Sequence, residues 1–495
     1  MNRQYIGARY VPKFSDKNDG VWDNAYSYEP LEIVKHGNDF YTSKKPVPVG
    51  TQINDTNYWV LTGDYNGAIA YLSERVSMLE RIKTVDTRND ISTTICNAGD
   101  IINTKNCYAG DGIDSTWIAE SGMGNGYTSI TLTNGLKASL VHGNTIHAHM
   151  IGAFPNDADC EGAINYALEN IDNVNILFGK GTYTFTENIE MKNYTSIIGE
   201  GDNTILYCSQ DPTDQHGEFI RIFREDGKTI GCKVENVSIK IYTATSPNED
   251  VNPFGIGNCE DVIIDGVHIL NSNWRGIQVE TTSYPVKDLT IRNCIIENTA
   301  LNCMGISHTA GGSIKNVLVE NCKFYNPKSG FGCVYLEGDN MDNVVFNNIY
   351  AETTDDIARA FYMVGAKNVT ISNLTVKTTA TAIAYVLLMQ NSSNVILSNI
   401  RLLAVTSGEL IGVGMLNTKN VMLTNYHCDN IDLGIRSVVI SAGDSDNLLF
   451  SNILQTNGRK CCVIDTTTTK GYLTGAISNG TVLSSSSTNF KEITA

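Results

Sequence analysis

The stretch "KNVTISNLTV", residues 367–376, recurs in altered form along the second half of the chain. Related copies are "IKNVLVENCKF", "MDNVVFNNIYA", "SNVILSNIRLL" and "KNVMLTNYHC". Each copy holds a turn residue, a short run of β-branched and aliphatic residues, another turn residue and a second run. Self-similarity at a fixed period is typical of proteins that stack one small unit many times.

The spacing of the copies defines the repeat. We name the residue before the first run the anchor, and successive anchors lie 25 to 28 residues apart. The anchors are Asp261, Asp288, Asn316, Asn343, Asn368, Asn394, Asn420 and Asn447. The residue five positions after each anchor is Gly266 in the first copy, and then Asn293, Asn321, Asn348, Asn373, Asn399, Asn425 and Asn452. A further copy contains Asn479.

No run in these repeats is long enough to bury a face alone. Stacked repeats would bury one continuous core and place equivalent strands parallel to each other. An Asn tolerates a left-handed turn and can hydrogen-bond its own equivalent in the next repeat, so ladders of Asn are expected. A leucine-rich repeat would need Leu at fixed positions, where Val and Ile dominate here. We therefore predict an all-β chain built on a right-handed parallel β-helix.

The segment just before the repeats predicts a covering helix. In "EGAINYALENI", residues 161–171, one helical face carries apolar side chains, namely Ala163, Ile164, Ala167, Leu168 and Ile171. Together with "ILFGKGTYTFTENIEMKNYTSIIGEG" this segment resembles the opening of pectate-lyase-like β-helix domains. Lys180 stands where that family has a Pro in its "PxGxY" pattern, so the resemblance implies the fold and not an activity.

A second resemblance lies in residues 97–142, which contain "AGD", "AGDGID" and "LTNGLKA". These motifs, in this order before a β-helix, resemble the neck segment of phage tail spikes and tail fibres. The residues that fit are Gly99, Asp100, Gly110, Asp111, Gly112, Leu132, Asn134, Gly135 and Ala138. The resemblance implies a virion tail protein that attaches to a phage baseplate or tail through its N-terminal region and associates as a homotrimer.

Residues 21–63 resemble a small chitin-binding-type β module. Trp22, Tyr28, Tyr41 and Trp59 fit its pattern. Exposed aromatic rings could stack on a sugar, which makes Trp22 and Trp59 carbohydrate-binding candidates. The alternative is that these rings form the core of a module with few other apolar residues.

The next segment, "DYNGAIAYLSERVSMLERIKTV", predicts a helix with an apolar seam of coiled-coil spacing. The seam consists of Tyr65, Ile69, Leu72, Val76 and Leu79. It could join identical chains or pack on its own chain. We divide the protein into an attachment or carbohydrate-binding-like module (1–63), a coiled-coil helix (64–90), a neck (91–150) and the β-helix with its capping helix (151–495).

Composition limits the partners. The formal net charge of −17 over 495 residues argues against nucleic acid and against an anionic membrane surface. The first residues lack a signal-peptide pattern and no run of about 18 apolar residues occurs, so we expect synthesis in the bacterial cytoplasm and no membrane insertion. The 13 cysteines are expected to be buried small apolar residues.

No motif identifies a reaction, so catalytic candidates come from the strand alignment. Aligning "RGIQVET", "MGISHTA" and "CVYLEGD" puts Glu280 and Glu337 two coils apart with Thr309 between them. Coils about 4.8 Å apart would separate their backbones by about 9–10 Å, near the range of inverting glycosidases. His308 and Asp339 lie beside the pair and complete the catalytic candidates. Outward residues of any β-helix are polar, so two Glu in register also arise without function.

Neighbouring turns supply binding candidates. Trp274 could stack on sugar and Arg275 could bind an acidic sugar, while Asp355, Asp356 and Arg359 fall at a matching turn. We predict no cofactor and no metal site, although a lyase would use a base with Arg and Ca²⁺. The acidic residues leave Ca²⁺ binding open without a recognisable ligand loop.

The sequence thus favours a phage tail spike or receptor-binding protein that recognises host surface polysaccharide. Whether it also depolymerises that polysaccharide, as a glycoside hydrolase or a lyase, is left open by the residues alone. The alternatives are a non-catalytic structural or adhesin tail fibre and a free pectin-type polysaccharide lyase.

Overall fold

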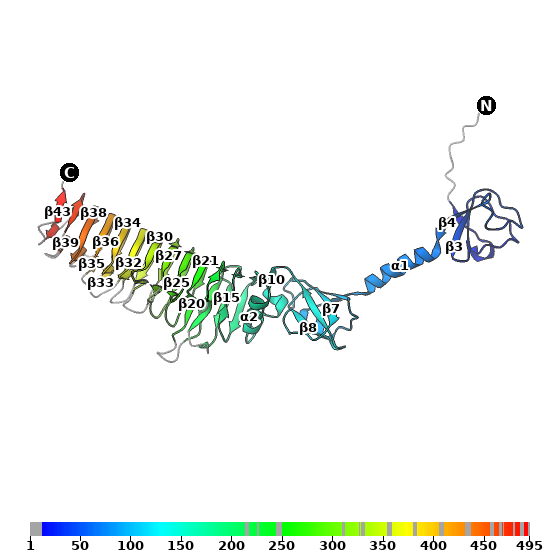
Figure 1. Ribbon diagram of the computed structural model, residues 1–495, viewed down its shortest axis with the longest axis horizontal. Coiled ribbons are helices and arrows are strands. Elements are labelled where there is room, and N and C mark those ends of the chain that lie inside the picture. The colour runs from blue at the N-terminus through cyan, green and yellow to red at the C-terminus, as the bar shows by residue number, and fades with distance from the viewer. Residues whose placement is uncertain are drawn as a thin grey trace, which may run out of the picture.

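The computed structural model is an elongated chain of four consecutive parts (Figure 1). It describes residues 12–212, 217–224, 227–243, 250–308, 312–325, 327, 332–353, 359–379, 384–404, 410–430, 437–455, 460–464, 468, 470–478, 481–485 and 490–493. A four-stranded sheet comes first, then one helix, then a five-stranded sheet, and a long solenoid of parallel strands forms the rest of the described chain.

The N-terminal module is a small sheet with an aromatic core. Its elements are β1 (Lys13–Phe14), η1 (Lys17–Gly20), β2 (Glu32–His36), β3 (Asp39–Ser43) and β4 (Trp59–Asp64). Tyr28 and Trp59 are both 2% exposed and meet edge to face, with ring centroids 5.2 Å apart. Burial of these large rings is what holds a module of this size together.

Helix α1 (Tyr65–Glu80) follows the module directly and stands apart from both sheets (Figure 1). Of the predicted seam, Leu72, Val76 and Leu79 are 56%, 51% and 68% exposed, and the side chains of Tyr65 and Ile69 lie outside the described part. The helix therefore does not pack its seam on its own chain. It also ends ten residues before the predicted boundary at 90, because the next residues already pair as β5 (Ile82–Val85) in the neck sheet.

The neck is a five-stranded sheet with the order β5-β6-β7-β9-β8. Its other elements are η2 (Arg88–Thr93), β6 (Ile101–Thr104), β7 (Ser115–Ser121), β8 (Ser129–Thr131) and β9 (Leu136–Val141). Arg88 is buried and donates to the carbonyls of Gly126, 2.6 Å away, and Met150, 3.1 Å away, and burial lowers its pKa to about 10. This cation ties the neck to the start of the solenoid.

The same joint contains a buried polar chain. The carboxylate of Asp111 lies 2.8 Å from Nδ1 of His149, on the short helix η3 (Ala148–Ile151), and Nε2 of His149 lies 2.9 Å from the hydroxyl of Tyr183 in the solenoid. The neck motif that contains Asp111 thus serves the contact between two parts of the fold.

In the described residues, the solenoid has one sheet of 22 strands and one of 12. The larger sheet contains β10 (Thr145–His147), β11 (Asn175–Leu177), β12 (Gly181–Phe185), β14 (Ser196–Ile198), β15 (Thr204–Cys208), β17 (Thr229–Ile230), β18 (Lys233–Glu235), β19 (Ser238–Ile241), β21 (Cys259–Asp265), β22 (His268–Ile269), β24 (Val286–Arg292), β25 (Ile295–Glu297), β27 (Ile314–Glu320), β28 (Lys323–Tyr325), β30 (Met341–Thr353), β32 (Lys367–Thr378), β34 (Ser393–Ala404), β36 (Lys419–Asn430), β38 (Asp446–Gln455), β40 (Gly471–Thr474), β41 (Ile477–Ser478) and β43 (Phe490–Ile493).

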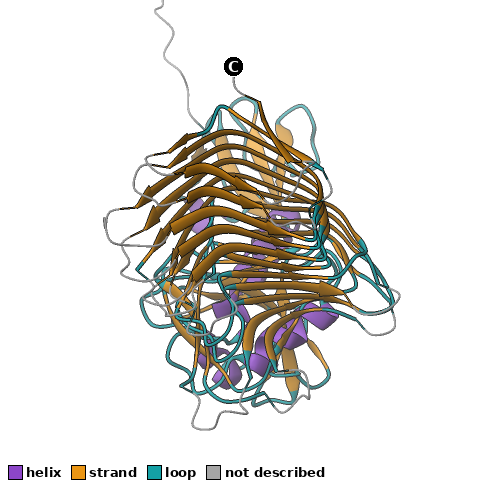
Figure 2. Cartoon of the chain, turned by 90° about the vertical axis from the view of Figure 1, so that its left-hand side faces the viewer, coloured by secondary structure: helices purple, strands orange, loops and turns teal. Residues whose placement is uncertain are grey.

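The smaller sheet contains β13 (Ile189–Glu190), β16 (Glu218–Ile222), β20 (Asn252–Ile256), β23 (Ile277–Thr281), β26 (Met304–His308), β29 (Val334–Glu337), β31 (Phe361–Val364), β33 (Ala384–Gln390), β35 (Leu410–Leu416), β37 (Ser437–Gly443), β39 (Lys460–Ile464) and β42 (Thr481–Ser485). All its pairings are parallel, and Figure 2 shows the strands of successive coils stacked side by side. The fold confirms the predicted all-β solenoid.

The Asn ladders are present on the larger sheet. Every anchor and every residue five positions later has a positive φ, including Asp288 at +53° and Gly266 at +63°. The amide of Asn399 donates to Asn373 over 2.9 Å and accepts from Asn425 over 2.9 Å. Each ladder therefore satisfies polar side chains at turns that only a few residue types tolerate. Asn479 lies outside the described residues.

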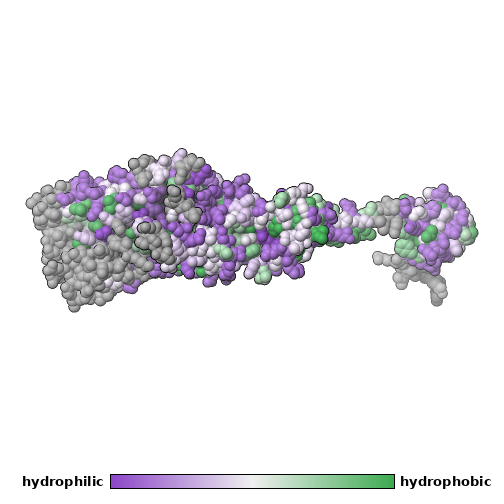
Figure 3. Space-filling model, turned by 90° about the horizontal axis from the view of Figure 1, so that it is seen from below, coloured by the Kyte–Doolittle hydropathy of each residue, from purple (hydrophilic) through white to green (hydrophobic). Residues whose placement is uncertain are grey.

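The core runs without interruption through the neck and the solenoid. Helix α2 (Glu161–Asn170) contributes the buried side chains of Ala163, Ile164, Ala167 and Leu168, and the fifth residue of the predicted face, Ile171, is buried directly after the helix. The 11 cysteines whose burial is described are free and buried, as expected. In the view of Figure 3 the described surface of the solenoid is mostly hydrophilic. Among the described residues, no helix is long and apolar enough to cross a membrane.

Candidate functional site

The smaller sheet presents one continuous line of outward positions. Strand register joins equivalent residues of successive coils, and alternate residues on these strands, such as Ile220 and Ile222, point into the core. We name this line the outer row; it consists of Glu190, Arg221, Gly255, Gln278, Gly305, Tyr335 and Tyr362. Two clusters of polar side chains lie along it.

The central cluster contains the predicted carboxylates. Glu280 pairs in register with Ser307, and Ser307 with Glu337, so both glutamates occupy equivalent positions two coils apart. The residue between them is Ser307 and not Thr309, which corrects the sequence alignment; Thr309 lies outside the described residues. Both glutamates are exposed. The coil spacing separates their backbones by about 9–10 Å.

Polar neighbours orient the two glutamates. The amide nitrogen of Gln278 donates to Glu280, 3.4 Å away, and to the hydroxyl of Ser307, 3.3 Å away. Burial and a hydrogen bond to Glu337 raise the pKa of Tyr335 to about 12. A neutral tyrosine therefore donates to Glu337, while an amide donates to Glu280, and the two carboxyl groups have different environments.

Arg275 lies close enough to both glutamates to interact with them electrostatically. Its guanidinium is 5.8 Å from the ring centroid of Tyr335 and donates to the amide oxygen of Gln278. Gly305 makes room for it, because a Cβ there would lie 2.8 Å from Cδ of Arg275. Burial lowers the pKa of Arg275 against the attraction of the surrounding groups, which include Glu280 and Glu337.

The other two catalytic candidates meet at the turn after β29: Asp339 lies in this turn, and His308 is the last residue of β26, one coil earlier. Nε2 of His308 accepts the backbone N–H of Asn340 at 2.9 Å and lies 3.6 Å from Asp339. Asp339 is also 3.1 Å from the ammonium of Lys367, whose hydrogen bond lowers the pKa of Asp339. Both residues thus have partners that shape a turn, and their catalytic role stays a prediction.

The aromatic candidates are in different places. Trp274 is half-buried in the turn before β23, next to Arg275. Trp59 lies in the core of the N-terminal module, so its ring is not available to a sugar in this structure. Trp22 packs on that core and meets the ring of His36 at 4.9 Å. The core interpretation of the module aromatics therefore fits both tryptophans better than sugar stacking does.

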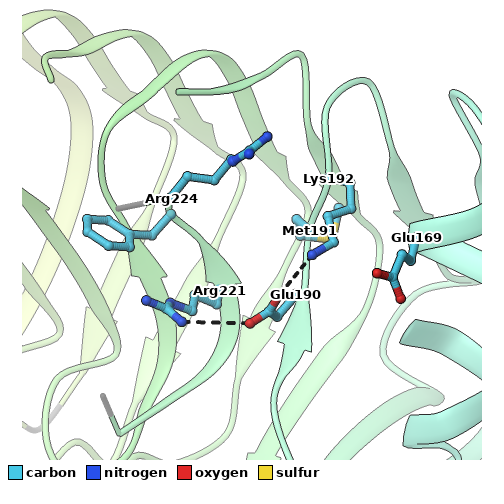
Figure 4. A pocket seen from close by; sticks show the side chains of 7 residues that line it. Glu169, Glu190, Met191, Lys192, Arg221 and Arg224 are labelled. Atoms are coloured by element: carbon cyan, nitrogen blue, oxygen red, sulfur yellow. Dashed lines mark hydrogen bonds and ion pairs between the residues drawn. The ribbon is translucent and has the colours of Figure 1, made fainter. Parts of the chain in front are cut away.

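The second cluster forms a pocket at the start of the outer row (Figure 4). The pocket has a volume of about 570 Å³ and is lined by Glu169, Glu190, Met191, Lys192, Arg221, Phe223 and Arg224. Figure 4 shows Glu190 between two cations: it lies 2.8 Å from Lys192 and 3.7 Å from Arg221. Arg221 lies 3.6 Å from Glu218 as well. The charges of this pocket are largely paired with each other.

No group of three or more metal-ligating side chains occurs in the part of the chain that the structure describes. The question of Ca²⁺ stays as the sequence left it. Asp355 and Asp356 lie outside the described residues, whereas Arg359 is described and lies beside Tyr362.

Sequence reasoning missed Gln278, Ser307, Tyr335 and Tyr362. The two tyrosines carried a usable signal, because "CVYLE" and "AFYMV" place a Tyr at the same position of successive strands. Their rings lie 5.4 Å apart. The residues that line the pocket gave no such signal in the sequence, because turns of unequal length bring them together.

Comparison with known proteins supports the fold of the solenoid. A model described as "Right handed beta helix region" matches residues 254–399. The solenoid is a right-handed β-helix. Comparison with curated protein sequences finds no match.

Two solved structures share this β-helix. The gp42 tailspike of Acinetobacter phage vb_AbaP_AS12 superimposes with a TM-score of 0.56 at 13% identity, covering 84% of this chain and 74% of the tailspike. PfbA, a surface adhesin of Streptococcus pneumoniae, superimposes with a TM-score of 0.52 at 15% identity, covering 67% of this chain and 91% of the adhesin. At such identities the likeness concerns the fold alone.

Proposed function

We propose that this protein is a tail-spike-like fibre that binds a surface polysaccharide along the outer row and cleaves it. The observation that carries the proposal is the pair Glu280 and Glu337, exposed and in register two coils apart, with Arg275 near both. The long exposed face of a solenoid suits an extended polymer. The tailspike neighbour lends the fold-level precedent for this proposal.

The two carboxyl groups would divide the work of an inverting hydrolysis. In this scheme Glu337, which accepts a hydrogen bond from Tyr335, is the general base. It takes a proton from a water that attacks the anomeric carbon. Glu280 is the general acid and gives its proton to the leaving oxygen as the glycosidic bond breaks.

A second function is favoured by the exposure of both glutamates. A general acid usually sits in an apolar setting that keeps it protonated, and neither side chain is buried. The same face would then bind the polysaccharide without cleaving it, as a non-catalytic adhesin. A free pectin-type lyase has less support. Such an enzyme has no need of a segment that resembles a tail-spike neck, or of a helix with exposed apolar side chains.

The test is to incubate the purified full-length protein with capsule and cell-wall glycans of candidate host bacteria and to size the products. Shortened chains support the depolymerase. Binding without shortening overturns cleavage and supports the adhesin. Neither binding nor shortening, across glycans from a range of hosts, overturns both.

Assembly into a trimer on a virion tail is part of the proposal. The exposed Leu72, Val76 and Leu79 of α1 form an apolar stripe that a second and third copy of the helix would cover. Leu72→Glu combined with Val76→Glu should convert a trimeric mass in light scattering to a monomeric one. Ser77→Glu, off the stripe on the same helix, is the matched control. A monomeric mass for the unaltered chain would contradict the trimer.

A further inference from the structure

Two arginines occupy the same position three coils apart beside the outer row. Arg275 lies two residues before the first residue of β23, and Arg359 lies two residues before the first residue of β31. The first residues of β23, β26, β29 and β31 are in register from coil to coil, so the two arginines are at equivalent positions. Their backbones are thus about 14 Å apart along the stack. Asn302 and Gly332 fill the two positions between Arg275 and Arg359, and Gly332 has no side chain to cover the space.

Each arginine lies over a tyrosine of the outer row. The guanidinium of Arg275 is 5.8 Å from the ring centroid of Tyr335, and that of Arg359 is 4.5 Å from the ring of Tyr362. The two rings are neighbours, 5.4 Å apart. The four side chains therefore form one surface of two rings and two cations.

Within the described part of the chain, neither guanidinium has a full set of hydrogen-bond partners. Both arginines are half-buried, and Nε of each is buried without a hydrogen-bond partner. Of the five donors of a guanidinium, Arg275 uses one, toward Gln278, and Arg359 uses none toward any described residue.

Other arginines of the solenoid are different. Arg221 lies within 3.7 Å of Glu190 and 3.6 Å of Glu218, and Arg292 lies 2.8 Å from Asp265. Arg275 and Arg359 make no ion pair with any residue that the structure describes. A half-buried cation without a direct ion pair is costly, and an anionic ligand in contact with it would reduce that cost.

We propose that Arg275 and Arg359 bind carboxylate groups of an acidic polysaccharide, such as one that contains uronic acid. This inference rests on the proposed function and narrows its substrate class. A guanidinium matches a carboxylate with two parallel N–H donors, and the neighbouring tyrosines offer rings to the sugar. In a chain with a formal net charge of −17, an acidic polymer is repelled overall, so two local cations would decide which acidic polymer is held.

The test compares uronate-containing bacterial polysaccharides with their carboxyl-reduced, neutral forms, using the full-length chain and binding measured by interferometry. We expect carboxyl reduction to weaken binding at least 10-fold, and Arg275→Gln and Arg359→Gln to do the same, because a hydrogen bond to a charged group is worth about 10- to 100-fold in affinity. Arg292→Gln, an ion-paired arginine on the other sheet, is the matched control and should leave binding unchanged.

The variants separate the chemistry of the contact from charge and folding. Arg275→Lys keeps the charge but loses the two-pronged donor, so it should bind more weakly than the unaltered chain and more tightly than Arg275→Gln. Equal melting temperatures of all variants exclude a folding defect as the cause.

The outcomes distinguish this inference from the proposed function. Equal affinity for the native and carboxyl-reduced forms overturns the inference. Preferential binding of a glycan whose negative charge comes from phosphate overturns it as well. Tight binding or cleavage of a neutral glycan, unaffected by either arginine substitution, overturns it as well and leaves the proposed function standing. No binding to any glycan overturns both.

Discussion

The two sheets of the solenoid use their outward positions in opposite ways. On the larger sheet the same side chain returns in nearly every coil, and its partner is its own copy, as for Asn399 between Asn373 and Asn425. On the smaller sheet the outer row changes from coil to coil and includes charged, amide, aromatic and glycine residues. Positions where the same residue recurs in each coil thus serve the stacking of the coils. Positions where the residue varies from coil to coil, as in the outer row, are free to bind a ligand.

The difference has a physical cause. A turn with positive φ admits few residue types and leaves polar groups to satisfy, so the Asn positions are constrained from within. The outer row lies on regular strands whose backbone groups are already paired by the neighbouring coils. Side chains there face outward and can vary without harm to the fold.

The largest effect is expected at the carboxylates of the outer face. Glu280→Gln and Glu337→Gln should each lower polysaccharide cleavage by about 10²- to 10⁴-fold, because each removes one partner of the acid–base pair. Product sizing over time gives the rates, and the melting temperature should not change. Glu320→Gln, on the larger sheet, is the control. Full activity in both variants would show that the pair is not catalytic.

A smaller effect, on stability, is expected at the ladder. Asn399→Ala should lower the free energy of unfolding by about 2 kcal/mol. An Ala is strained at a φ of +55°, and it cannot make the two side-chain hydrogen bonds of Asn399. Asn399→Gly keeps the backbone relaxed and should cost about half as much. Urea unfolding measures both. Equal losses for Ala and Gly would mean that the left-handed turn is not what selects Asn.

The outer row supplies the matching comparison. Tyr362→Phe removes one hydroxyl, which donates to Gln390 over 3.0 Å, on a regular strand. It should lower the free energy of unfolding by no more than about 1 kcal/mol. A loss as large as that of Asn399→Ala would contradict the contrast between the two sheets.

The smallest effect concerns pH at the start of the ladder. The hydrogen bond from Asn316, and then Lys287, hold the pKa of Asp288 below its ordinary value. The stabilisation is therefore complete above the unfolded pKa of about 3.9 and is lost as the pH falls through the lower folded pKa. Asp288→Asn should show a smaller fall in its urea midpoint between pH 7 and pH 3. An unchanged fall would exclude this contribution.

The sequence predicted what repeats and little of what does not. The anchors predicted the strand stack and its positive-φ turns because the period is visible without the third dimension. The register of the candidate site was only partly accessible: Glu280 and Ser307 are 27 residues apart, but Ser307 and Glu337 are 30 apart. Because the turns differ in length, a fixed repeat length does not give the register of the strands. The sequence alignment therefore placed Thr309 at the position that Ser307 occupies.

Other features depend on packing that periodicity does not contain. A Trp that fits a binding pattern, such as Trp59, can equally fill the core of a small sheet, and only its burial decides. The position of Arg275 over Tyr335 results from Gly305, whose missing side chain opens the path across one coil. The end of α1 was misplaced because Ile82–Val85 gains more from pairing with Ile101–Thr104 than from another helical turn.

The hydrogen bonds between coils have a mechanical consequence. They run along the axis of the rod, so an axial pull loads every coil interface in series and the weakest one parts first. Among the described strands, the two-residue ones include β13 and β17 in the early coils and β41 in the last coils, whereas β32, in a middle coil, has 12 residues, so the interfaces toward the two ends have the shortest strands. An axial push instead compresses a close-packed core, which yields little. The solenoid should therefore resist axial compression and, under axial tension, separate first near its ends rather than in its middle coils.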